Sequence, residues 1–105
     1  MAKEEITYEE FLAFQAKLEI KIGEIMAADR VPKSYGLKLY VDFGDDDTRT
    51  VFSNIGKTNE PEDLVGLKMP FITNLAPSVI KGVDSQAMIL TEVGLDKFEK
   101  GTILL

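Results

Sequence analysis

The stretch that decides the fold is Leu18–Met26, LEIKIGEIM, in which apolar residues alternate with charged residues or glycine. A period of two is typical of a β-strand with one apolar face. Leu18, Ile20 and Ile22 would form that face, and Gly23 inside the run indicates a bend or bulge that lets a sheet curl. A long, strongly curved strand predicts a barrel.

Four more strands are predicted C-terminal to this one, and they lie at residues 37–43, 48–54, 68–74 and 86–91. Between the third and fourth strands, residues 59–66 contain a cap candidate, a proline, acidic residues and a final glycine, which predicts a short helix. Five strands with a helix in this place are typical of an all-β OB-fold barrel, a five-stranded, partly open barrel. An SH3-like small barrel is the competing architecture.

A short helix is also predicted near the N-terminus, over residues 7–16. Thr7 and Glu10 have the spacing of a capping box, and Phe11 and Phe14 fall on one side. We expect this helix to cover one end of the sheet. The apolar residues of 95–105 are expected to pack on the barrel or on a second subunit.

The composition limits the chemistry available to the chain. Its 105 residues predict a single domain, 1–105, and they include no cysteine and no histidine. Thiolate nucleophiles, histidine-based triads and the usual zinc sites are therefore excluded, and we expect no enzyme activity, metal or cofactor. The Asp45–Asp47 run lacks the ligand spacing of a calcium loop, which favours a solvated turn.

Charge and hydropathy restrict the partners further. A net charge of −6 argues against indiscriminate binding to polyanions, although the acidic excess lies at the two ends and the middle is balanced. A small basic face in the middle is compatible with this distribution. The sequence shows neither a long apolar run nor the pattern of a signal peptide, so we expect a cytoplasmic protein without membrane insertion.

Two places have the residue types of a binding surface. On the polar face of the strand 37–43, Lys38 lies beside Tyr40, a pair that suits nucleic acid and is equally compatible with a solvated face. The stretch Asn74–Leu90 places Pro77, Lys81 and other turn and polar residues between two apolar runs. A simple connection between strands does not need so many turn-forming and polar residues, so this stretch is predicted to be a loop that is exposed to a binding partner.

Several segments resemble the tRNA-binding domain family in order and spacing, and they are LEIKIGEI at 18–25, LKLY at 37–40, RTVFS at 49–53, PEDLVG at 61–66, NLAP at 74–77, KG at 81–82 and SQAM at 85–88. That family includes the C-terminal domain or β subunit of methionyl-tRNA synthetase, free-standing dimeric tRNA-binding proteins and CsaA-type export chaperones. The resemblance covers about residues 16–92. It implies a non-catalytic OB-fold homodimer that recognises tRNA mainly by shape.

The resemblance also implies contact residues, by motif position, and they are Lys38, Arg49, Ser53, Asn74, Lys81, Ser85 and Met88. Lysines suit phosphates, Asn and Ser suit sugar or base edges, and a thioether can lie against a base. Taken singly, most of these residues also have structural explanations, such as a capped turn for Asn74 or a core position for Met88. With Tyr40 from the strand pattern, they form the predicted RNA-binding set.

Two departures from the family pattern bear on which branch applies. Ala87 stands where the family usually has glycine, which would add a methyl group where a ligand approaches the backbone. The loop Pro32–Gly36 is closer to the chaperone branch. Two functions are therefore expected to compete: a tRNA-binding module, alone or with methionyl-tRNA synthetase, and a chaperone that binds unfolded polypeptide or the export machinery.

Overall fold

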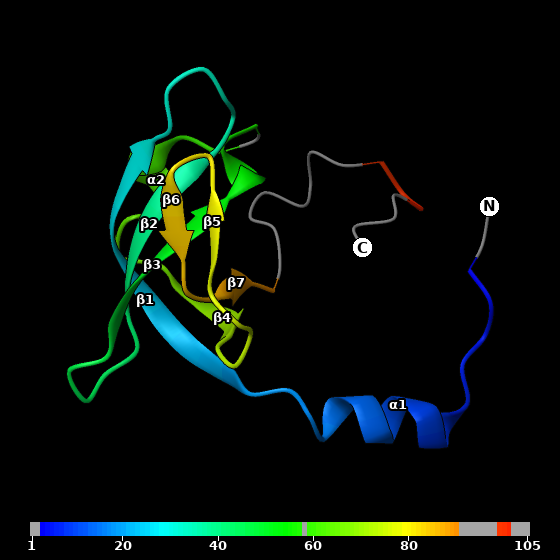
Figure 1. Cartoon of the computed structure of the whole chain (residues 1–105). Helices are drawn as coiled ribbons and strands as arrows, with labels where there is room; N and C mark the ends of the chain where they lie inside the picture. Colours follow the sequence, from blue (N-terminus) through cyan, green and yellow to red (C-terminus); the bar gives the residue numbers. More distant parts are fainter. Residues whose placement is uncertain (1–2, 58, 91–98, 102–105) are drawn as a thin grey trace.

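The computed structural model describes residues 3–57, 59–90 and 99–101, and it confirms the all-β barrel with short helices (Figure 1). One five-stranded sheet, in the order β3-β2-β1-β4-β7, curls into a nearly closed barrel of OB type. Its strands are β1 (Ile20–Arg30), β2 (Leu37–Asp42), β3 (Thr48–Ser53), β4 (Lys68–Ile72) and β7 (Met88–Ile89).

The long strand β1 belongs to both halves of the barrel. Its first part pairs with β4 and its second part with β2, both antiparallel, and Glu24 has a partner on each side. The register against β2 shifts between Ile25 and Ala27, so the bulge lies at Met26. A bulge bends a strand and increases its twist, which allows the two parts of β1 to pair with different strands as the sheet curves. The sequence predicted the curvature, but the bulge is three residues beyond Gly23.

Gly23 has a different role from the predicted bend. A side chain at this position would collide with the side chains of Val41 and Phe43, so the glycine permits close packing inside the barrel. Gly23 and Ile25 are buried, whereas Ile20 and Ile22 are exposed, Ile22 by 70%. The predicted apolar face of β1 is therefore wrong over its first half. The isoleucines point outward because the strand's pairing places the alternate residues inside.

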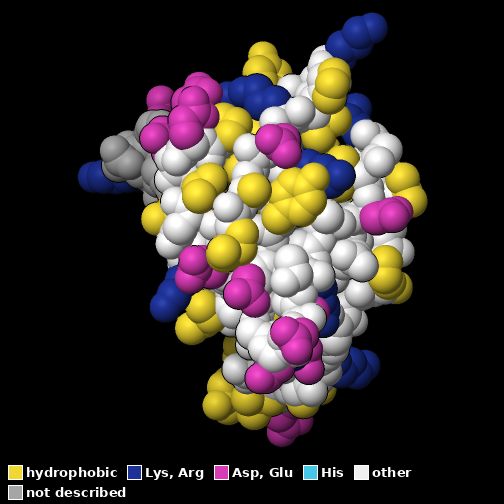
Figure 2. Space-filling view, turned by 90° about the vertical axis from the view of Figure 1, so that its left-hand side faces the viewer, with side chains coloured by type: hydrophobic (Ala, Val, Ile, Leu, Met, Phe, Trp, Pro, Cys, Tyr) yellow, Lys and Arg dark blue, Asp and Glu magenta, His cyan; other side chains and the backbone are white. Residues whose placement is uncertain are grey.

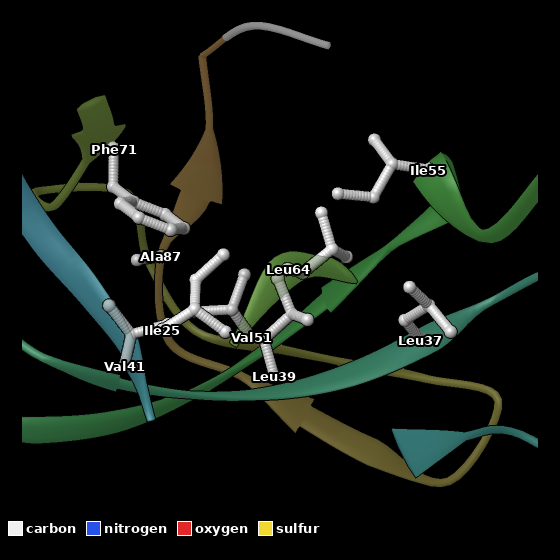
Figure 3. Packing of buried hydrophobic residues seen from close by; sticks show 9 residues of the cluster. All are labelled: Ile25, Leu37, Leu39, Val41, Val51, Ile55, Leu64, Phe71 and Ala87. Carbon is white, nitrogen blue, oxygen red and sulfur yellow. The ribbon is translucent and has the colours of Figure 1, made fainter. Parts of the chain in front are cut away.

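The core consists of aliphatic side chains around one aromatic ring (Figure 3). Phe71 is fully buried and meets Phe43 edge to face at 5.4 Å between ring centroids. The other buried members come from β1, β2, β3, the two short helices beside the barrel and the link between β6 and β7, and they are Ile25, Leu37, Leu39, Val41, Val51, Ile55, Leu64 and Ala87. Alternation along β2 supplies three of them, as the sequence predicted.

A hairpin lies within Asn74–Leu90, the stretch that was predicted from the sequence to be a loop. It consists of β5 (Ser78–Ile80) and β6 (Val83–Ser85), which form a separate two-stranded sheet. Side chains join β6 to β3: Phe52 N–H donates to Ser85 Oγ at 3.0 Å, and Thr50 Oγ1 donates to the Asp84 carbonyl at 2.7 Å. Polar side chains thus close the gap that backbone pairing leaves open between these strands.

The helices are η1 (Asn54–Lys57, 3-10), α2 (Pro61–Leu64) and α1 (Tyr8–Gln15). The capping box of Thr7 and Glu10 is present at α1. The prediction that this helix covers the sheet is wrong, because every residue of α1 is exposed and the helix lies away from the barrel (Figure 1). Its apolar side chains therefore face solvent in a single chain.

The barrel has two ends with different loops (Figure 1). The β1–β2 loop, 31–36, and the β5–β6 turn lie at one end, and the β2–β3 turn and the β4–β5 loop lie at the other. Most of the C-terminal segment 95–105, for which packing was predicted, is outside the described residues. Among the helices of the described part, none is long and apolar enough to cross a membrane.

Candidate nucleic-acid interface

The outer face of β2 presents a cation beside a ring. Leu37, Leu39 and Val41 point into the core, so Lys38 and Tyr40 point outward, and both are half-buried. The Lys38 ammonium lies 5.2 Å from the centroid of the Tyr40 ring. Such a pair offers a positive charge for phosphate and a ring face for a base. The structure therefore brings these two predicted residues together.

Lys81 stands at the tip of the β5–β6 hairpin, at the end of the barrel where β2 begins (Figure 1). The outward ring of Phe52, paired with Lys38 across β2 and β3, packs with Val31 and Val83. This small second cluster fixes the hairpin against the sheet outside the main core. Lys38, Tyr40 and Lys81 thus belong to one side of the molecule.

Arg49 and Ser53, also in the predicted set, are engaged within the protein. The Arg49 guanidinium binds the Asp47 carboxylate through two nitrogens, at 2.9 and 3.1 Å, and donates to the carbonyls of Thr73 at 2.7 Å and Gln86 at 3.2 Å. It also lies 5.4 Å from the Phe43 ring. Ser53 is buried, and its Oγ accepts from the Ile55 N–H at 3.3 Å.

Asn74 connects the barrel to the segment that leads from α1. Its Oδ1 accepts from the Glu19 N–H at 2.9 Å, and its Nδ2 donates to the Lys17 carbonyl at 2.7 Å. The adjacent Thr73 donates to the same Glu19, from its N–H and hydroxyl to the Glu19 carbonyl and from the hydroxyl to the Glu19 carboxylate. Asn74 therefore lies at the end of the barrel opposite Lys81, where it holds the connection to the helix.

Among Ser85 and its neighbours, some side chains are buried in the barrel and others are exposed at the surface. Ser85 is 8% exposed, and its Oγ, besides accepting from Phe52, donates to the Ala87 carbonyl at 3.1 Å. Ala87 is 5% exposed, and its methyl group lies in the core near Phe71 (Figure 3), so the added methyl does not face a ligand. Met88 is half exposed, whereas Ile89 packs on the core, so the alternative core position for Met88 is wrong.

Two carboxylates near Arg49 have shifted pKa values. The Thr73 hydroxyl, and then the charge of Lys21, lower the pKa of Glu19. The hydrogen bond from Arg49 lowers the pKa of Asp47. Both groups are therefore ionised at neutral pH, and they neutralise cations at this end of the barrel. Arg49 is less suited to phosphate than Lys38 or Lys81.

The face shown in Figure 2 has basic, acidic and hydrophobic side chains interleaved, without a broad basic area. A family model described as "Putative tRNA binding domain" matches residues 20–104. The chain belongs to the tRNA-binding domain family. The family assignment made from the sequence is thereby confirmed.

Relatives of this tRNA-binding domain occur in longer proteins and as small solved structures. It is 38% identical over 103 residues to a methionine–tRNA ligase of Methanococcoides burtonii, covering 97% of this chain and 14% of the ligase. A MetRS-related protein from Pyrococcus horikoshii superimposes with a TM-score of 0.69 at 34% identity, covering 84% of this chain and 77% of that one. The chaperone CsaA of Bacillus anthracis gives 0.68 at 27%, covering 87% and 80%.

The tRNA-binding domain has further polar residues that sequence reasoning did not assign. A cavity of about 370 Å³ lies between the β1–β2 loop and the hairpin tip, and its lining consists of Lys33, Ser34, Tyr35, Asn54 and Lys81. The sequence showed Lys33 and Tyr35 in a loop marked by proline, serine and glycine, which was the available signal. Their proximity to Lys81 depends on tertiary structure, because nearly fifty residues separate them along the chain.

Proposed function

We propose that the chain is a non-catalytic tRNA-binding module, acting as a free-standing homodimer or as a β subunit of methionyl-tRNA synthetase. The observation that supports this most directly is the family match over residues 20–104. The outward positions of Lys38, Tyr40 and Lys81 add cations and a ring on one side of the barrel. Few cations on an acidic protein favour recognition of tRNA by shape, with a small number of phosphate contacts.

The proposed homodimer would cover apolar side chains that a single chain exposes. On α1, Tyr8, Phe11 and Phe14 face solvent, and on the outer sheet face Ile20 pairs with Ile72, which pairs with Met88. Exposed apolar side chains on both a sheet face and a helix are unusual on a monomer. Sedimentation at micromolar concentration tests the dimer, and a single species with the mass of one chain would contradict it.

The tRNA proposal is tested by retention of bulk tRNA on filters at low and moderate salt. We expect binding that weakens as salt rises, because phosphate contacts release counterions. Lys38→Ala should weaken it and reduce the slope of log affinity against log salt by about one. Lys68→Ala, an exposed lysine at the start of β4, is the matched control and should behave as the wild type. An absence of retention at low salt would refute the proposal.

The exposed apolar surface also favours a second candidate, a chaperone for unfolded polypeptide, which the likeness to CsaA supports. A shallow hollow of about 140 Å³ beside Phe52, Leu75 and Met88 would suit apolar side chains. This alternative predicts slower aggregation of an unfolded client at stoichiometric protein, unaffected by added tRNA. If aggregation proceeds at the same rate with and without the protein, the chaperone function is excluded.

A further inference from the structure

The cavity between the β1–β2 loop and the hairpin tip, here called the loop cavity, combines the groups that a nucleotide needs. Its lining contains two lysines, a serine hydroxyl, a tyrosine ring and an asparagine amide, and none of these residues is acidic. Of the five, only Lys81 was in the set predicted from the sequence. The volume of about 370 Å³ lies near the lower limit of small-molecule sites, which suits one nucleotide and excludes a duplex.

The two lysines of the loop cavity keep their charges available. Three other cations of the described residues form ion pairs: Arg30 with Glu60 at 2.8 Å, Arg49 with Asp47 at 2.9 Å, and Lys21 with Glu19 at 3.7 Å. Within the described residues, no carboxylate oxygen lies within 4.0 Å of the ammonium of Lys33 or Lys81. In a chain of net charge −6, this is a local positive site suited to an anion.

Both lysines occupy backbone positions that other residues fill more easily. Lys33 has φ of 61° and Lys81 has φ of 49°, in the left-handed region that costs a residue with a Cβ about 1 kcal/mol or more. Lys81 and Gly82 form the two-residue turn between the paired Ile80 and Val83, where asparagine followed by glycine is preferred. Asparagine at either lysine position would therefore retain the loop while removing the charge.

The loop that contributes Lys33 and Tyr35 is held in place by packing and hydrogen bonds. Ser34 Oγ donates to the Val31 carbonyl at 3.3 Å and accepts from the Gly36 N–H at 3.0 Å. Gly36 lies so close to the Phe52 ring that a side chain would collide with it, and Gly56 is equally close to the Tyr35 carbonyl. The cavity is therefore pre-formed between three fixed segments, which reduces the entropy cost of binding.

We propose that the loop cavity binds one unpaired nucleotide of RNA. Its base would stack on the Tyr35 ring, which is 62% exposed, and its phosphate would lie between the ammonium groups of Lys33 and Lys81. The Asn54 amide offers one donor group and one acceptor to a base edge. A base inside a duplex has no free ring face, so the site selects a single-stranded or extruded nucleotide. The inference depends on the proposed function and identifies a part of tRNA that the domain would contact.

The test is a fluorescence-anisotropy titration of the full chain with a short, unstructured, labelled single-stranded RNA and with a duplex of the same length. Tyr35→Ala should weaken single-strand binding about five- to hundredfold, the equivalent of one stacked base, while Tyr35→Phe retains it. Duplex binding should be the same in all three proteins. Equal single-strand affinity for wild type and Tyr35→Ala would overturn the proposal.

The charge contribution is measured with Lys33→Asn and Lys81→Asn, which keep the turn geometry. Each should reduce the salt slope for the single strand by about 0.7 per lost phosphate contact, whereas Lys68→Ala leaves it unchanged. Circular dichroism verifies that the variants are folded. If tRNA is retained on filters but these substitutions change nothing, the loop cavity is not the site and the tRNA function stands. If tRNA itself is not retained at low salt, both the proposed tRNA-binding function and the loop-cavity site are refuted.

Discussion

Replacing Ser85 by alanine should destabilise the barrel without removing an RNA contact. The Ser85 hydroxyl accepts from the Phe52 N–H at 3.0 Å and donates to the Ala87 carbonyl at 3.1 Å. Since Ser85 is buried, water cannot readily replace it. The alanine variant would leave one donor and one acceptor without partners, where β6 approaches β3.

The magnitude follows from the cost of burying polar groups without hydrogen bonds, about 1–3 kcal/mol for each. A carbonyl oxygen tolerates the loss better than an N–H, so we expect a total of about 2–3 kcal/mol. This is a large share of the roughly 5–15 kcal/mol by which a domain of this kind is stable. With a urea dependence of about 1–3 kcal/mol per molar, the unfolding midpoint should fall by about 1–2 M.

Ser78→Ala is the matched control for this experiment. Ser78 pairs with Ser85 across the β5–β6 hairpin, but its side chain is exposed, so its loss should change stability by less than about 0.5 kcal/mol. The tRNA affinity of folded Ser85→Ala should stay within about twofold of wild type. This reasoning would be refuted if Ser85→Ala unfolded at the same urea midpoint as Ser78→Ala but bound tRNA clearly more weakly. Ser85 would then be a direct contact.

Three further outcomes are expected at other positions. Gly23→Ala should lower the free energy of unfolding by about 1–3 kcal/mol in urea titrations, because its methyl group collides with neighbouring side chains, and unchanged stability would contradict that packing. Asn74→Ala should cost about 1 kcal/mol and leave tRNA affinity unchanged, and a selective loss of affinity would make Asn74 a contact. The pKa of Glu19 is lower in the folded state, so ionised Glu19 stabilises the fold above its ordinary pKa, and this contribution disappears as pH falls through the folded pKa. Thr73→Val should reduce the loss of stability measured between roughly pH 6 and pH 3, and an identical pH profile would count against the Glu19–Thr73 bond.

The sequence by itself determined the features that depend on neighbouring residues. The capping box of Thr7 and Glu10, the alternating pattern of β2 and the short helix near Pro61 are all local, and all three are present. Together with the segments that match the family in order and spacing, they were sufficient to predict the OB barrel. The hairpin β5–β6 was not predicted, because strands of three residues are too short to show a period.

Tertiary structure alone decided which side chains are available to a partner. Ile20 and Ile22 alternate like core residues, yet the pairing of β1 with β4 turns them outward. Asn74 has its hydrogen bonds with residues 55 and 57 positions away, which no local pattern shows. The same long-range folding brings Lys33 to Lys81. A side chain's type is written in the sequence, but its free hydrogen-bonding groups depend on neighbours that only the folded chain provides.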